Sequence, residues 1–145
     1  MSKLTWHFQH IRPDEVVEIA ANSAAEWVKG MHLPEGENPF PGKKVIGRVW
    51  IGGDGVEGEY IRQGAAGADA YFARVLPFYQ NRPYAHCWEG PNEPQPMSEQ
   101  WFRSVFAEFE VRRVHLLHGH GLLAASGQIS EGNIPTPEAA LQLAP

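Results

Sequence analysis

The chain has 145 residues, with 12 Lys and Arg against 17 Asp and Glu, and its net charge of −5 argues against nucleic-acid binding, which requires clustered positive charge. Apolar residues make up 43% and charged residues 20%, which is ordinary globular usage and excludes a disordered chain. The single Cys87 excludes an internal disulfide framework, and the absence of a run of about 18 apolar residues argues against a membrane span. We expect one domain over residues 1–145, and a cytoplasmic location because the first residues lack a secretory signal.

The first half of the sequence predicts two strands and a helix before a long loop. Residues 4–10 are apolar and β-favouring, and Pro13 with the acids after it is typical of a helix start. That helix is expected to end around Asn22, and residues 26–31 form the second predicted strand. Three prolines and two glycines within residues 33–42 predict a loop.

The second half repeats the alternation of strand and helix. Residues 44–51 are almost continuously apolar, as in a buried strand of a parallel sheet. Apolar side chains recur at helical spacing over 57–79, with a break expected near Gly64 or Gly67. Residues 84–88 are a predicted short strand, and an apolar stripe predicts a helix over 96–117.

Residues 122–129 give a fifth predicted strand, and 136–143 a further helix. The strands recur about every 30 residues, close to the spacing of a complete eight-unit α/β barrel of roughly 250 residues. The predicted fold is therefore α/β, a partial (β/α) TIM-type barrel of about five parallel strands.

A distinctive motif follows the fourth predicted strand. The sequence from Trp88 to Pro94 is W-E-G-P-N-E-P, and it resembles the Asn-Glu-Pro motif of clan A retaining glycoside hydrolases, in which it ends the fourth barrel strand. The resemblance covers about five of the eight barrel units. It implies a retaining β-glycosidase with Glu93 as general acid/base and Asn92 bound to the sugar 2-hydroxyl.

The same resemblance suggests further substrate-binding residues near the strand ends. Arg48 and Trp50 follow the third predicted strand, and Trp88 lies at the end of the fourth; both indoles suit either sugar stacking or the core. His86 suits a polar place in the barrel interior or the sugar pocket. Glu89, if ionised, would raise the pKa of Glu93 and keep it protonated.

Retaining chemistry requires a second carboxyl about 5 to 5.5 Å from the first, and the family's nucleophile ends a seventh strand that this chain does not reach. Such a half-barrel leaves open sheet edges, which predicts completion by self-association. In a four-plus-four barrel, Asp54 of a second copy would face Glu93.

Two other functional classes stay open: a non-catalytic carbohydrate-binding module and a structural oligomer derived from a glycosidase barrel. Carbohydrate and a second copy are the expected partners, and no cofactor is expected. His118 and His120 lie close in sequence, but no third residue has the spacing of a metal ligand, so no metal is expected.

Overall fold

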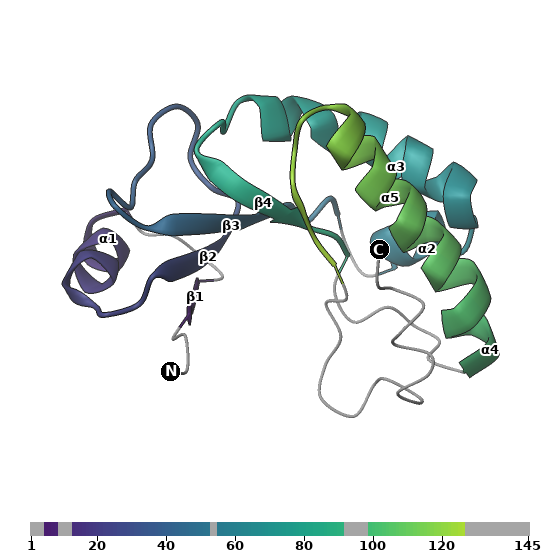
Figure 1. Ribbon diagram of the computed structural model, residues 1–145, viewed down its shortest axis with the longest axis horizontal. Coiled ribbons are helices and arrows are strands. Elements are labelled where there is room, and N and C mark those ends of the chain that lie inside the picture. Colours follow the sequence, from purple (N-terminus) through teal and green to yellow (C-terminus); the bar gives the residue numbers. More distant parts are fainter. Residues whose placement is uncertain (1–4, 9–12, 53–54, 92–98, 127–145) are drawn as a thin grey trace.

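The computed structural model describes residues 5–8, 13–52, 55–91 and 99–126. Among them, five parallel strands form one sheet in chain order, β1-β2-β3-β4-β5 (Figure 1). The strands are β1 (Thr5–Phe8), β2 (Trp27–Met31), β3 (Lys44–Arg48), β4 (Ala85–Glu89) and β5 (Ala124–Ala125). This α/β architecture was predicted, and its strand order is compatible with a partial (β/α) barrel.

Helices occupy the connections from β1 to β2, from β3 to β4 and from β4 to β5. They are α1 (Pro13–Asn22), α2 (Val56–Ile61), α3 (Gly64–Gln80), α4 (Glu99–Trp101), the π-helix η1 (Phe102–Phe106) and α5 (Ala107–Gly119). The start at Pro13 and the break before Gly64 are confirmed. The π-helix was not predicted, and it interrupts the single helix that was expected over 96–117.

Two predicted elements reach into residues that the structure does not describe. Only Ala124–Ala125 of the predicted strand 122–129 is found as strand, and residues from 127 onward, including the predicted helix 136–143, lie outside the described residues. None of the described helices combines the length and hydrophobicity needed to cross a bilayer.

The core lies between the sheet and helices α3 and α5. The bulky side chains that are almost fully buried there include Tyr71, Tyr79, Trp88 and Phe109. Tyr79 stacks on Trp88 with ring centroids 4.2 Å apart, and Tyr71 meets Phe109 edge to face at 5.8 Å. The helices are thus fixed to the sheet largely by aromatic contacts.

The connection from β2 to β3 is the predicted loop rather than a helix. This loop is held by Arg82 and Tyr84, which lie between α3 and β4. Arg82 donates hydrogen bonds to the carbonyls of Leu33 and Phe78, and its guanidinium lies 3.4 Å from the Phe78 ring centroid. Tyr84 donates to the Pro34 carbonyl at 2.6 Å. Burial lowers the pKa of Arg82, against the opposing effect of Glu35.

Burial of tyrosine hydroxyls predicts loss of stability at alkaline pH. Burial raises the pKa of Tyr79 to about 12 and that of Tyr71 well above its usual value. An unfolded tyrosine ionises near pH 10, so the unfolded state loses protons first and stability falls as the pH rises from 10 to 12. For Tyr79 alone the loss over this range is about 2 kcal/mol, measurable by urea unfolding at fixed pH values.

The Tyr79→Phe variant is the control for this pH dependence. Its free energy of unfolding at pH 7 should stay within about 1 kcal/mol of the parent, because the Tyr79 hydroxyl makes no well-formed hydrogen bond to a described residue. A variant that lost as much stability as the parent between pH 10 and 12 would contradict the assignment to Tyr79.

Candidate functional site at the carboxyl ends of the strands

The carboxyl end of β3 holds Arg48, the first predicted substrate-binding residue. Arg48 is buried, and its guanidinium lies 3.2 Å from the Glu57 carboxylate at the start of α2. Its carbonyl accepts the His32 N–H at 3.1 Å. Because Glu57 already holds it, Arg48 is a fixed cation at this edge of the sheet. Glu57 was not among the predicted site residues.

Trp50 follows β3 and remains accessible. Its exposed fraction is 46%, one of the highest for a large apolar side chain among the described residues. An indole so exposed, two residues after Arg48, suits stacking against an apolar sugar face. The geometry of Trp50 therefore agrees with the sugar-stacking alternative rather than with core packing.

Glu89 ends β4, and Lys29 of β2 reaches across β3 to it. Their charged groups are 2.7 Å apart, and the side chains are 16% and 9% exposed. In the paired strands Lys29, Arg48 and Glu89 alternate with residues that face α3, so all three lie on the opposite face of the sheet. Lys29 was missed from the sequence because only the fold brings it to Glu89.

This ion pair changes the expected role of Glu89. A lone carboxylate raises the pKa of a neighbouring acid, but a carboxylate beside an ammonium has most of its charge offset. The Glu89–Lys29 pair therefore weakens the argument that Glu89 keeps Glu93 protonated. Glu89 also raises the pKa of Cys87, after the larger effect of burial on that thiol.

Trp88 lies on the other face, in the core. It is 1% exposed, stacks on Tyr79 and meets the Phe78 ring edge to face at 5.8 Å. A Cβ at Gly47 would come within 2.3 Å of its ring, so the glycine is what allows the indole to lie over β3. Trp88 is thus a packing residue, and the core alternative holds for it.

His86 lies near the beginning of β4, away from the carboxyl ends. Its Nδ1 accepts the Val45 N–H at 3.2 Å, and its ring meets Trp27 edge to face at 5.9 Å. This places His86 with backbone and aromatic neighbours at the opposite end of the strand from Arg48 and Glu89. The side chain is exposed, so the expected place in the barrel interior is not found, and its ring is bonded to the backbone of β3 instead.

Beneath the strand ends lies a buried ion pair that the sequence analysis did not identify. Arg113 of α5 is fully buried and binds both oxygens of Glu110, at 2.8 and 2.6 Å. It also donates to the carbonyls of Trp88 and Ala125, at 3.3 and 2.9 Å. Burial alone would lower the pKa of Arg113, but Glu110 outweighs it and the pKa is raised.

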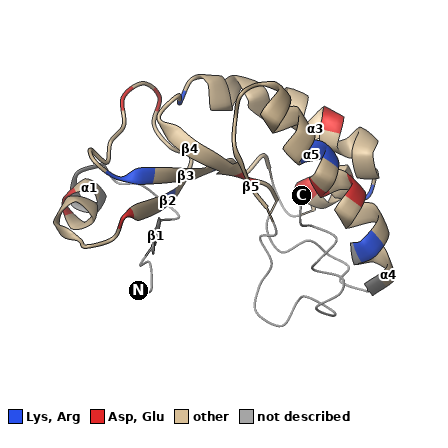
Figure 2. Ribbon diagram, in the orientation of Figure 1, with Lys and Arg blue, Asp and Glu red and all other residues tan. Residues whose placement is uncertain are grey.

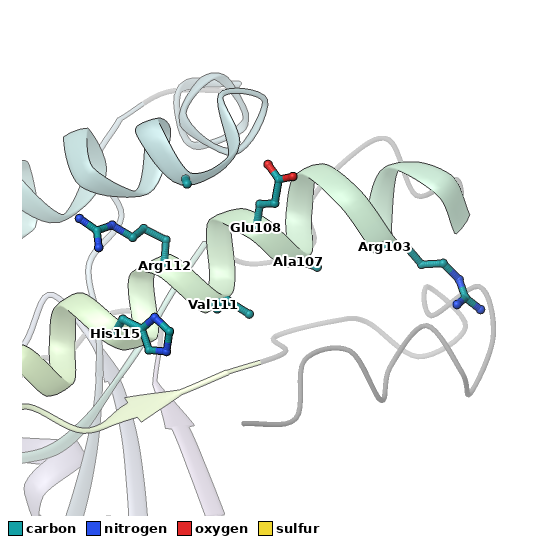
Figure 3. Close-up of a pocket in the computed structure, with 7 residues that line it drawn as sticks. Arg103, Ala107, Glu108, Val111, Arg112 and His115 are labelled. Atoms are coloured by element: carbon teal, nitrogen blue, oxygen red, sulfur yellow. The ribbon is translucent and has the colours of Figure 1, made fainter.

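A hollow lies on the outer surface of the helices, between α3 and the segment formed by η1 and α5 (Figure 3). Its volume is about 430 Å³. It is lined by Ala65, Arg103, Ala107, Glu108, Val111, Arg112 and His115. Acidic and basic positions both occur along α5 (Figure 2). None of the residues predicted for the sugar site lines this hollow.

The described residues contain no group of three or more His, Cys, Asp or Glu side chains suited to a metal ion. His120 instead lies 2.9 Å from the Leu116 carbonyl and packs on Phe72. His118 and His120 therefore form part of no such group.

The two predicted catalytic residues, Asn92 and Glu93, lie outside the described residues, as does Asp54. The described chain resumes at Glu99, so the site is defined here by Arg48, Trp50, Glu57, Lys29 and Glu89. Comparison of the whole chain with known protein families, curated proteins and solved structures finds no match.

Proposed function

We propose that this protein acts on β-linked carbohydrate by retaining glycosidase chemistry. The observation that carries the proposal is the position of the W-E-G-P-N-E-P sequence: β4 is the fourth strand of a parallel sheet in chain order, and it ends at Glu89, within this sequence. Catalytic groups of α/β barrels lie at the carboxyl ends of the strands. The fixed cation Arg48 and the exposed Trp50 at that edge support a site with both a polar group and an aromatic face for a sugar.

In this proposal Glu93 is the general acid and then the general base. A glycosidic oxygen is a poor leaving group, so Glu93 donates a proton to it while a second carboxylate attacks the anomeric carbon. Glu93, now ionised, removes a proton from the water that releases the sugar. Asn92 holds the sugar through a hydroxyl, and Trp50 stacks on a ring face.

The second carboxylate is proposed to come from a second copy of the chain that completes the barrel. Of the described acids near the strand ends, Glu57 and Glu89 are held by Arg48 and Lys29. Asp54 of a partner copy is the proposed source, in a four-plus-four barrel in which β5, paired with β4 in the single chain, gives up its place to the partner's first strand. Light scattering over a range of concentrations is expected to give the mass of a dimer, and Asp54→Asn should then abolish the hydrolysis that the parent shows; a monomer at all concentrations would contradict this arrangement.

The Glu93→Gln variant tests the acid/base assignment directly. Against 4-nitrophenyl β-glycosides, we expect a fall in kcat of about 10²- to 10⁴-fold, the usual contribution of a general acid. With 2,4-dinitrophenyl β-glycosides, whose leaving group needs little protonation, added azide should restore turnover because it attacks without a general base. Glu59→Gln is the matched control, since Glu59 pairs with Arg62 at the exposed surface.

A second function, non-catalytic carbohydrate binding, is favoured by the ion pairing of both described carboxylates at this edge. Binding of β-linked oligosaccharides by calorimetry without hydrolysis, unchanged in Glu93→Gln but lost in Trp50→Ala, would support it and overturn the catalytic proposal. Hydrolysis by Glu93→Gln at the rate of the parent would also overturn the catalytic proposal.

A further inference from the structure

The pairing of β3 with β4 is irregular at one point. Val45 pairs with Ala85, but the next residue of β3, Ile46, pairs with Cys87, so His86 is an extra residue in β4. Bulges of this kind redirect side chains, and they are rare in parallel sheets. This one lies within the pair of strands that carries Arg48 and Glu89.

The extra residue decides which face each later side chain of β4 takes. Paired residues of parallel strands face the same side of the sheet, and successive residues alternate. With the bulge, Trp88 shares the face of Gly47 and packs on Tyr79, and Glu89 takes the opposite face with Lys29. Without it, continuous pairing from Val45 would place Glu89 toward the helices and Trp88 away from them.

The imidazole of His86 supplies the hydrogen bond that the bulge interrupts. Val45 is fully buried, and its N–H is directed to His86 Nδ1 at 3.2 Å. A buried N–H without an acceptor costs about 1 to 3 kcal/mol, so an irregular ladder requires a substitute acceptor at this point. The side-chain nitrogen takes the place of a backbone carbonyl.

We propose that His86 is a positioning residue that fixes the register of β4 through the Val45 N–H, and thereby assigns Trp88 to the core and Glu89 to the site face. The inference rests on the described geometry and holds whether or not the protein hydrolyses sugars. It gives His86 a role other than contact with substrate.

The bond requires a neutral imidazole with its proton on Nε2, since a protonated ring has no acceptor at Nδ1. Trp27 packs on this ring, and Lys44 lies 5.1 Å above Trp27 while pairing with Glu26 at 2.7 Å. Lys44, the residue before Val45 in β3, is therefore paired with Glu26, the residue before β2.

The bond can be observed directly by NMR in the intact chain. An N–H to N hydrogen bond transmits a scalar coupling between its two nitrogens, so Val45 N and His86 Nδ1 should be coupled at pH 7.5. Loss of the bond should raise the hydrogen-exchange rate of the Val45 amide by roughly tenfold, the factor that corresponds to one net hydrogen bond. Absence of the coupling at pH 7.5 would overturn the proposal.

Two variants separate positioning from ordinary strand stability. Asn carries an acceptor oxygen at the position of Nδ1, so His86→Asn should keep both the contact between the Trp88 and Tyr79 rings, seen as a nuclear Overhauser effect, and the protection of the Val45 amide from hydrogen exchange. His86→Val has high β propensity but no acceptor. It should lose the amide protection and weaken the ring contact; unchanged protection and contact in His86→Val would overturn the proposal.

Discussion

Replacement of Arg113 by Leu is expected to lower the free energy of unfolding by about 3 to 5 kcal/mol. The change leaves the Glu110 carboxylate, which is 3% exposed, without its bidentate partner in the core. It also removes the donor to the carbonyls of Trp88 and Ala125. Folded domains are stable by only about 5 to 15 kcal/mol, so urea unfolding should show a large shift of the midpoint or an unfolded protein.

The adjacent arginine provides a matched control. Arg112 pairs with Asp69 at 2.8 Å, but the two side chains are 45% and 50% exposed. Exposed ion pairs contribute less than about 1 kcal/mol, so Arg112→Leu should shift the midpoint little. The double variant with Arg113→Leu and Glu110→Leu should recover part of the loss, since no buried charge is then left unpaired. Equal effects of the two single arginine variants would contradict this account.

Replacement of Gly67 by Ala should be the second severe change. A Cβ at this position would lie 1.7 Å from the backbone oxygen of Tyr60, and a backbone atom cannot move aside as a flexible side chain can. Helices α2 and α3 would have to separate around Tyr60. We expect a loss of about 3 kcal/mol or more, because overpacking usually costs 1 to 3 kcal/mol even where side chains can adjust.

Gly119→Ala distinguishes this steric effect from helix propensity. Gly119 is the last residue of α5, and a Cβ there meets nothing within 4 Å. Alanine is favoured over glycine in helices by about 1 kcal/mol, so thermal unfolding of Gly119→Ala should occur at or slightly above the parent's temperature. A Gly67→Ala variant as stable as Gly119→Ala would show that the approach of α2 to α3 is not tight.

The order of strands and helices could be predicted because local signals mark most of their ends. Pro13 begins α1, prolines and glycines keep the connection from β2 to β3 without a helix, and the break before Gly64 separates α2 from α3. The π-helix could not be predicted, because the same apolar spacing fits one continuous helix. Its residues are placed by packing, such as the stacking of Phe106 on Trp101 at 5.8 Å.

The candidate site could be predicted only in part. Arg48, Trp50 and Glu89 were named from their positions after strands, and they lie at the carboxyl edge of the sheet. The face that each side chain takes in β4 depends on the bulge at His86, and a bulge leaves no signal in hydrophobic alternation over five residues. Lys29 was missed because it lies far from Glu89 along the chain, and the pairing of Glu57 with Arg48 could not be predicted because it depends on how the turn after β3 places the start of α2.

The contacts of Arg113 also bear on the order in which the chain can fold during synthesis. Because neighbouring strands follow one another along the chain, β1 to β4 can pair as soon as each emerges, with α5 added next. The Ala125 carbonyl, however, belongs to the last described strand. A nascent chain that has not yet released β5 lacks one of the carbonyl acceptors of this arginine, so docking of β5 completes the hydrogen bonding of a buried guanidinium.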